Sequence, residues 1–558
     1  MNENRRALLK GTAAAGILAS TGLRTSDVPG QIVPVPTPVL APPPYVTPFK
    51  DPLFIPPIKV AARMYPECAK YRVEGECGRD AHQAFDRFPP QADSEYIVDV
   101  GVTTHRFHSE LPLEQVWAYD GTIPGPTFVE RSFRPTMVRF INNLPEHHKG
   151  FGSPEISTHL HGAHVGSESD GFAGNYYSRE DKGPTISDKG AFYDHHYPNV
   201  PSKGDPRNIC GTLWYHDHRE EFTAANVYRG LAGMYLVFDE IDSGNENDPN
   251  PKALRLPSGV GKYDIALIVQ DKLFDIGGNL VFNQLDPEGF LGNLMMVNGT
   301  VSPYFKVEAR KYRFRLLDAS MARYFQFHLH NEAGANQEFT FVASDGNLLE
   351  RPVKMTKLFM GMAERADIII DFGKYPPGTK LFLVNMLEQI DPRKPSGSLL
   401  SKPVRLLRFD VGEKTPDSPP IPAFLRALPP MPVDIVRTRR WELGRANGQW
   451  TINNKFFDPE RVDAVVKHNQ AEIWKFDIGG GWAHPIHIHL DDFRILSYNG
   501  RKPPPEWAGR KDVVPLLPGS EMRLLVMFTD YVGKYMMHCH QTAHEDSAMM
   551  VRYDVVQA

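Results

Sequence analysis

Four short histidine pairs constrain this sequence more than any other feature. Ten of its 21 histidines fall into four tight clusters. These clusters are His159-Leu160-His161, His216-Asp217-His218, His484-Pro485-Ile486-His487-Ile488-His489, and His538-Cys539-His540 followed by His544. In a β-strand, residues two apart point to the same face, about 6 to 7 Å from each other. Each pair therefore aims two imidazoles into one space, and the four pairs together predict metal binding on β-strands.

The last cluster is the most specific. On a strand His538 and His540 face one way and Cys539 faces the other, so one short segment can reach two metal sites. Cys539, His544, Met549 and the distant His484 offer the thiolate, two imidazoles and weak thioether of a blue-copper centre. The alternatives are a structural zinc site or a buried free cysteine. Zinc prefers four strong ligands and would leave the other histidine pairs unexplained.

The rest of the chain is typical of an all-β protein. Short alternating segments are separated by Gly, Pro and Asn, and long helical periodicity is missing. Clear examples are Thr136–Ile141, Gly233–Phe238, Tyr312–Leu317, Asp367–Phe372, Glu472–Phe476 and Met522–Phe528. Polar, Pro- and Gly-rich stretches at 241–261 and 412–432 divide these segments into three groups. We therefore expect three β-domains, at 91–240, 262–411 and 433–558, each a usual size for a sandwich.

Composition excludes several classes of protein. The 558 residues carry a formal net charge of −5 with no long run of one sign, which argues against nucleic-acid binding and against a polybasic membrane binder. Four cysteines in so long a chain exclude a disulfide-stapled scaffold.

The N-terminus predicts export. Arg5 and Arg6 precede Leu8 and Lys10, and a mild apolar stretch follows that is too short to span a bilayer. This pattern resembles a twin-arginine signal peptide, which we place at 1–27 and which predicts a periplasmic or extracellular protein; a disordered basic N-terminus is the alternative. Residues 28–90 are expected to form a Pro-rich N-terminal extension. Within it, residues 28–57 are so rich in proline that they cannot pair in a sheet, and they predict a linker or a strap lying over the body.

The remaining histidines and cysteines carry less information. His328 and His330 form a lone pair in the middle domain, so we expect a solvated or locally hydrogen-bonded strand face. The adjacent residues His147-His148 and His195-His196 would diverge on a strand and are expected at the surface. Cys68 and Cys77 could form a disulfide, and Cys210 is expected to be a buried thiol.

Longer motifs around the ligands resemble a known family. Three of them are Ser157–Gly162, Leu213–His218 and His538–His540 with His544-Glu545-Asp546 and Met549-Met550 beyond. Ala118–Thr127 and Arg310–Arg315 add support. The chain from about Glu95 onward resembles the three-domain multicopper oxidases of the laccase superfamily, in particular bacterial spore-coat laccases and bilirubin oxidases. The resemblance implies that each domain is a cupredoxin, a Greek-key β-sandwich or barrel.

The resemblance also implies a ligand for each of four copper ions. His484, Cys539 and His544 would bind the type 1 copper, with Met549 axial, and His159 and His487 would bind the type 2 copper. The type 3 pair would take His161, His216, His218, His489, His538 and His540. The trinuclear cluster would then lie between the first and last domains, with the middle domain as a spacer.

The implied reaction is the oxidation of a small reducing substrate, one electron at a time, coupled to the reduction of dioxygen to water. The family places carboxylates near the oxygen path, and Asp170 and Glu545 match them. An ordinary solvated acid, or one that only orients a ligand, is the alternative for each. No nucleic acid or stable membrane insertion is expected, and we expect a monomer.

The substrate is the open question. Trp482, two residues before His484, could line a docking surface for a flat aromatic donor, or it could be a core residue. We expect phenolic, aromatic or tetrapyrrole donors. A metallo-oxidase of Cu(I), Fe(II) or Mn(II) is the rival, although the 18 methionines are scattered and no Met-rich insertion is present.

Overall fold

The computed structural model describes residues 42–83 and 93–558. The predicted signal peptide lies outside these residues. The all-β prediction is confirmed, and each of the six alternating segments forms a strand. In β26 (Ala471–Ile478), for example, Trp474 and Phe476 are buried while Lys475 between them is partly exposed. This alternation is what the two-residue period of a strand gives when one face packs on a core.

The first pair of sheets spans residues 94–238. One sheet has the order β2 (Glu114–Tyr119), β1 (Ser94–His105), β4 (Thr136–Asn142) and β6 (Phe192–Tyr197). The other has the order β3 (Gly125–Arg131), β8 (Ala232–Phe238), β7 (Thr212–Asp217) and β5 (Thr158–His161).

The second pair spans residues 264–411. The larger sheet runs β12 (Thr300–Val301), β11 (Leu294–Val297), β9 (Asp264–Phe274), β14 (Lys311–Asp318), β20 (Arg365–Asp371), β17 (Phe339–Ser344), β18 (Asn347–Met355), with β10 (Leu280–Val281) on β9. The smaller runs β13 (Tyr304–Val307), β22 (Leu399–Val411), β21 (Lys380–Leu387), β15 (Phe325–Asn331), β16 (Asn336–Gln337), with β19 (Leu358–Met360) on β15.

The third pair spans residues 435–556. One sheet runs β24 (Gln449–Ile452), β23 (Ile435–Ala446), β26, β31 (Glu521–Met527), β28 (Phe493–Tyr498), β29 (Arg510–Lys511). The other runs β25 (Ala464–Lys467), β33 (Met550–Val556), β32 (Gly533–Cys539), β27 (His484–Ile488), β30 (Val513–Leu516).

The same topology occurs three times. In each pair of sheets the first long strand lies parallel to a later one: β1 with β4, β9 with β14, and β23 with β26. In the companion sheet an early strand lies parallel to the last: β3 with β8, β13 with β22, and β25 with β33. We refer to the three units as the first, middle and last domains. Each domain encloses its own buried apolar core.

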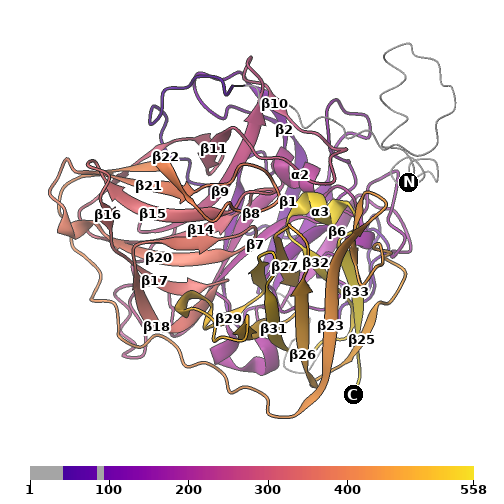
Figure 1. The fold of residues 1–558 in the computed structure, drawn as a ribbon. Coiled ribbons are helices and arrows are strands. Elements are labelled where there is room, and N and C mark those ends of the chain that lie inside the picture. The colour runs from indigo at the N-terminus through magenta and orange to yellow at the C-terminus, as the bar shows by residue number, and fades with distance from the viewer. Residues whose placement is uncertain (1–41, 84–92) are drawn as a thin grey trace.

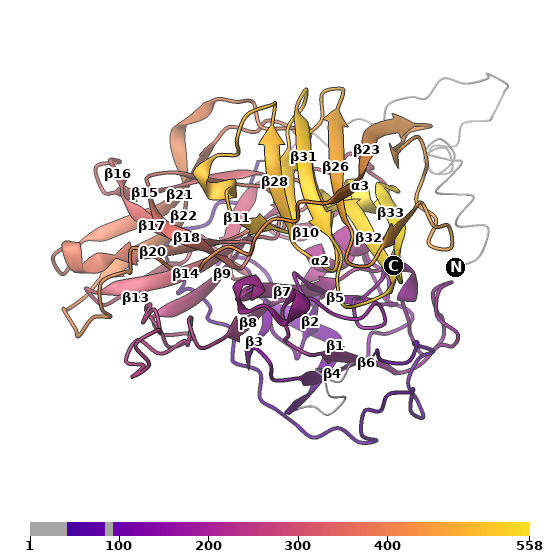
Figure 2. The ribbon, with the colours of Figure 1, turned by 90° about the horizontal axis from the view of Figure 1, so that it is seen from below.

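The three domains meet around one shared region. Figure 1 shows the middle domain beside the other two, and Figure 2 shows the first and last domains facing each other. A buried apolar cluster joins all three, with Trp214 from the first domain, Ala363 from the middle and Val513 from the last. Burying a large apolar side chain contributes about 1.5–3 kcal/mol, so this cluster holds the domains in one arrangement. β5, β7, β27 and β32, which carry the histidine pairs, belong to the two facing domains.

The described part of the proline-rich extension crosses the first and middle domains. Pro52 forms an isolated bridge with Tyr304, and Ile58 forms one with Thr127. The prediction that residues 28–57 cannot pair in a sheet was therefore wrong at Pro52, because a proline can still accept through its carbonyl and flanking residues can donate. Leu53, for instance, donates its N–H to the carbonyl of Tyr304 at 2.7 Å.

Helices are few and short in the part of the chain that the structure describes. The α-helices are α2 (Thr223–Arg229) and α3 (Thr542–Asp546), which contact each other. The 3-10 turns are η1 (Ala173–Asn175), η2 (Ser202–Gly204), η3 (Pro206–Asn208), η4 (Phe372–Lys374) and η5 (Pro505–Trp507). Among residues 42–83 and 93–558, no helix is both long and apolar enough to cross a membrane.

Candidate metal centre

Strand pairing brings the histidine pairs together two by two. In the first domain β5 pairs with β7, which sets His159 opposite His216. In the last domain β27 pairs with β32, which sets His487 opposite His538. Because side chains directly opposite on paired strands are close neighbours, each pair of strands presents its imidazoles as one patch.

The two patches face each other across the domain interface. His161 stacks on His487 with ring centroids 3.7 Å apart, and His159 stacks on His489 at 4.0 Å. His540 completes the group, with its ring 5.2 Å from that of His161 and 5.3 Å from that of His216. All eight imidazoles predicted for the trinuclear cluster therefore lie in one buried region.

Three ring nitrogens point at one another. Nε2 of His538 lies 3.2 Å from Nε2 of His218 and 3.2 Å from Nε2 of His489. On the opposite side of the His489 ring, Nδ1 lies 2.7 Å from a carboxylate oxygen of Asp170, to which it donates. The Nε2 lone pair of His489 is therefore directed at its neighbours, an arrangement that a bound cation would stabilise.

Other ligand rings are oriented by main-chain carbonyls. Nδ1 of His216 donates to the carbonyl of Asp217, and Nδ1 of His487 donates to the carbonyl of Asp512, each over 2.8 Å. Nδ1 of His159 donates in the same way to the carbonyl of Asp170. Nε2 of all three of these rings is buried and has no hydrogen-bond partner. A hydrogen bond at one ring nitrogen fixes the tautomer and leaves the other free to bind metal.

Burial keeps these imidazoles neutral, as metal ligands must be. Burial lowers the pKa of His216 and His218 to about 3. It lowers the pKa of His159, His487 and His489 well below the ordinary range, and neighbouring imidazoles add to the effect. The buried, unpartnered nitrogens and their neutral state both fit a metal cluster.

The two predicted carboxylates lie beside the cluster. Besides holding His489, Asp170 is fully buried, and burial raises its pKa well above the ordinary value. The carboxylate oxygens of Glu545 lie 3.3 Å from Nδ1 of His218 and 3.1 Å from Nδ1 of His538. Both acids thus contact ligand rings on the side away from the converging nitrogens.

A second set of donors lies on the other face of β32. Sγ of Cys539 is 3.6 Å from Nδ1 of His484 and 3.7 Å from Nδ1 of His544, and these two nitrogens are 3.2 Å apart. Burial raises the pKa of the Cys539 thiol well above its ordinary value, so ionising it requires a strong cation such as a metal. The predicted axial residue Met549 is buried in the same core as Cys539, and its N–H donates to the carbonyl of His544 at 2.9 Å.

Comparison with known proteins agrees with this geometry. The multicopper oxidase family profiles match residues 277–396 and 432–558. A bilirubin oxidase of Albifimbria verrucaria is 36% identical over 82% of this chain and 76% of its own length. A laccase of Bacillus subtilis (strain 168) is 32% identical over 82% of this chain and 94% of its own. The chain belongs to the multicopper oxidase family.

The fold agrees as well. The crystal structure of a variant of the McoA multicopper oxidase from Aquifex aeolicus superimposes with a TM-score of 0.72 and 25% identity, covering 91% of this chain and 99% of that one. The predicted cupredoxin-like β-domains and the oxidoreductase class are thereby confirmed. The family binds copper, and the thiolate, thioether and imidazole donors of the second set are those that copper prefers.

In this multicopper oxidase Trp482 lies beside the predicted type 1 ligand His544. The indole is partly exposed and meets the ring of His544 edge-on, with centroids 5.2 Å apart. The guanidinium groups of Arg393 and Arg445 lie over it at 5.3 Å and 5.9 Å. Trp482 therefore contacts a predicted ligand and is itself partly open to solvent.

Several predictions for the other histidines and cysteines can now be assessed. His328 is locally hydrogen-bonded, to Asn336 at 3.0 Å, as expected. The surface prediction for His195 and His196 was wrong, since both are buried. Strand β6 is covered on both faces: His195 packs against Phe140 in the core, and His196 packs against His82 of the N-terminal extension.

The two adjacent histidines at 147 and 148 differ in exposure. His147 is exposed as predicted, whereas His148 is partly buried, with its ring 5.0 Å from that of Trp117. Cys68 and Cys77 are free thiols and form no disulfide with each other. Cys210 is also a free thiol and is partly buried.

Sequence reasoning missed three residues at the centre. Trp450 packs on His544 with ring centroids 3.9 Å apart, and Asp512 and Arg365 form an ion pair next to His161. Asp512 lies downstream of the His484–His489 cluster. Its only signal in the sequence is that an acidic residue follows a ligand cluster in the same domain. Arg365 comes from the middle domain, and no signal in its sequence neighbourhood points to the metal centre.

Proposed function

We propose that this chain is a laccase-like oxidase that binds four copper ions, takes single electrons from phenolic and other aromatic donors, tetrapyrroles included, and reduces dioxygen to water. The observation that carries the proposal is the position of Cys539. Its thiol contacts His484 and His544, while its chain neighbours His538 and His540 point into the eight-histidine cluster.

The backbone therefore joins the two ligand sets within three consecutive residues. Copper bound by these ligands supplies the one-electron chemistry and the affinity for dioxygen. The protein supplies the orientation of the ligands, the covalent connection between the two sets and the exclusion of bulk water. All ten of the predicted histidine ligands are buried, so few water molecules can reach the ligand nitrogens.

The carboxylates would supply protons. Glu545 contacts Nδ1 of both His218 and His538, and Asp170 accepts from Nδ1 of His489. Burial raises the pKa of Asp170, so this acid can hold a proton within hydrogen-bond distance of the cluster. The imidazoles of His538 and His218 outweigh burial and lower the pKa of Glu545, so this carboxylate would take up a proton and pass it on. Reduction of dioxygen to water consumes protons as well as electrons, and buried acids at fixed positions would deliver them.

The donor would dock on Trp482. Its partly exposed indole meets His544, and a flat aromatic molecule can stack or pack edge-on against it. The rival, oxidation of Cu(I), Fe(II) or Mn(II), would not require this surface. We further propose export by the twin-arginine pathway to the periplasm or the outside of the cell, and action as a monomer.

The test is spectroscopic. The purified copper-loaded protein should be blue, contain four coppers per chain and consume oxygen with aromatic reductants. Visible absorption, copper analysis and oxygen uptake measure these properties. A colourless holoprotein with fewer than three coppers would overturn the proposal.

A further inference from the structure

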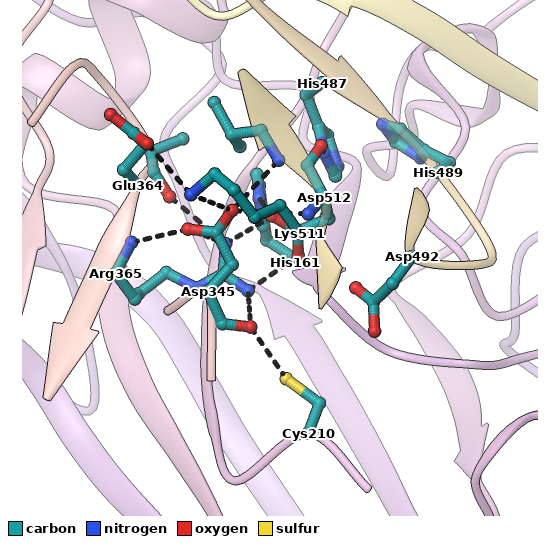
Figure 3. Close-up of polar contacts among 12 residues, drawn as sticks. His161, Cys210, Asp345, Glu364, Arg365, His487, His489, Asp492, Lys511 and Asp512 are labelled. Atoms are coloured by element: carbon teal, nitrogen blue, oxygen red, sulfur yellow. Dashed lines mark hydrogen bonds and ion pairs between the residues drawn. The ribbon is translucent and has the colours of Figure 1, made fainter. Parts of the chain in front are cut away.

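An ion pair links the middle domain to a residue that contacts the metal centre. Arg365, the first residue of β20, lies against Asp512, which sits between β29 and β30 of the last domain (Figure 3). Nη1 and Nη2 of the guanidinium each donate to one carboxylate oxygen of Asp512 at 2.6 Å. Both side chains are buried. A two-pronged arginine–carboxylate contact fixes orientation as well as distance.

The Arg365 guanidinium has no freedom to turn away. It has five N–H groups, of which two contact Asp512. The other three donate to main-chain carbonyls, of Thr212 at the start of β7 and of Ala363 and Asp345, each at 3.2 Å. All five donors are therefore used, and the contacts come from all three domains.

Asp512 in turn contacts two ligand rings at different atoms. One carboxylate oxygen lies 3.3 Å from Nε2 of His161, which donates to it, and the main-chain carbonyl accepts from Nδ1 of His487 at 2.8 Å. The opposite nitrogens, Nδ1 of His161 and Nε2 of His487, are buried and have no hydrogen-bond partner. One residue thus sets which nitrogen each of two stacked imidazoles offers to metal.

The main chain at Asp512 is held by the middle domain too. A carboxylate oxygen of Asp345 accepts from the N–H groups of both Asp512 and Val513 at 3.2 Å. The ammonium of Lys511 lies 2.9 Å from Asp345 and 2.9 Å from Glu364, both in the middle domain (Figure 3). These contacts fix the carbonyl that holds His487.

The chain around His161 leaves room for this contact. Gly162, directly after His161, has φ +87°, and a Cβ there would lie 2.6 Å from Nη2 of Arg365 and 2.9 Å from Oδ2 of Asp512. Any larger residue would displace the ion pair, in addition to the strain of the positive φ. The turn that ends β5 is therefore shaped around Arg365 and Asp512.

We propose that Arg365 is a positioning residue for the trinuclear copper cluster: the middle domain, which supplies none of the predicted ligands, orients His161 and His487 through Asp512. This inference rests on the proposed four-copper function. It assigns the middle domain a role in the metal centre beyond that of a spacer.

The experiment compares copper-loaded Arg365→Gln with the wild-type protein. Glutamine keeps some hydrogen bonds but loses the charge and the two-pronged contact. Loss of a partner that orients a ligand commonly weakens metal binding about 10- to 100-fold. We expect type 2 copper to be lost at about 10- to 100-fold lower chelator concentration, with an altered type 2 electron paramagnetic resonance spectrum. The blue type 1 absorption should stay at wild-type intensity.

Two further variants separate positioning from general stability. Arg310→Gln removes another buried arginine of the middle domain, one that pairs with Glu246 instead, and it should leave the type 2 spectrum unchanged. Arg365→Lys keeps the charge but loses the two-pronged contact with Asp512. It should fold and give a type 2 spectrum intermediate between those of the wild type and Arg365→Gln. A wild-type type 2 spectrum and copper retention in the folded Arg365 variants, or an equal effect of Arg310→Gln, would overturn the inference.

The same measurements separate this inference from the proposed function. If the wild-type protein itself binds no type 2 copper, the four-copper proposal fails. If the wild-type protein binds it and Arg365→Gln binds it equally well, only the role of Arg365 fails.

Discussion

The imidazole rings of His161 and His487 lie stacked, with centroids 3.7 Å apart and planes 14° apart. The two residues belong to different domains and are 326 positions apart in the chain. Neither ring is held by the other; each is oriented by Asp512. Domain packing is therefore part of the chemistry of the site, because the cluster exists only while the first and last domains stay in register.

Replacing Cys539 with serine should abolish the blue colour and the oxidation of donors together. Serine cannot supply the thiolate that gives a type 1 centre its colour, and it interrupts the connection between the ligand sets. Visible absorption and oxygen uptake measure both effects. Cys68→Ser, at a free thiol in the N-terminal extension, should remain blue and active. A blue and active Cys539→Ser protein would contradict the assignment.

Glu545→Gln should slow dioxygen reduction about 100-fold or more while the protein remains blue. The amide keeps the shape of the side chain but cannot take up and release a proton. Rapid mixing of the reduced protein with oxygen, followed by the return of the blue absorption, measures the step.

The neighbouring acid gives a matched control. Burial and the charge of Glu545 raise the pKa of Asp546 well above its ordinary value. Its carboxyl accepts from the N–H of Ala224, and an asparagine keeps an acceptor oxygen there, so Asp546→Asn should change turnover little. Equal rates for Glu545→Gln and wild type would rule out a proton role for Glu545.

Trp482→Ala should raise the apparent KM for bulky phenols and tetrapyrroles about 2- to 10-fold, as loss of an aromatic contact worth about 0.5–1.5 kcal/mol predicts. A small one-electron donor should be affected much less, because binding rather than chemistry is lost. Trp482→Phe, which retains a ring, should have a smaller effect. Steady-state rates with phenols, bilirubin, Cu(I), Fe(II) and Mn(II) make the comparison. If a metal ion is the fastest donor and the organic substrates are unaffected, the metallo-oxidase alternative is correct.

Replacing Arg5 and Arg6 with lysine should leave the protein in the cytoplasm. The twin-arginine pathway reads the arginine pair itself, so retaining the charge is not enough. Cell fractionation followed by detection of the protein measures its location. Unchanged export would show that another feature of the N-terminus is recognised.

Local patterns predicted the strands and the composition of the site. The two-residue period of an extended chain places both histidines of each pair on one face, so the pairing of ligands follows from the sequence alone. Strand β5 contains both of its histidines, whereas His218, His489 and His540 directly follow β7, β27 and β32. The same holds for Cys539, which must face away from His538 and His540 on an extended strand.

Local patterns failed where burial came from a distant segment. His195 and His196 diverge as the strand period requires, yet both are buried, because the core covers one face of β6 and the N-terminal extension covers the other. Nothing within a few residues of either histidine records those neighbours.

The sequence by itself determined the all-β class, the ligand types and the faces on which they lie, because these depend on backbone periodicity and side-chain chemistry. Tertiary structure alone decided how the ligands are oriented. Arg365 and Asp512 are 147 positions apart, and their ion pair forms because domain packing brings the two side chains into contact in a buried space. Inside that space the pair is held by all three domains, and it sets the rings of His161 and His487.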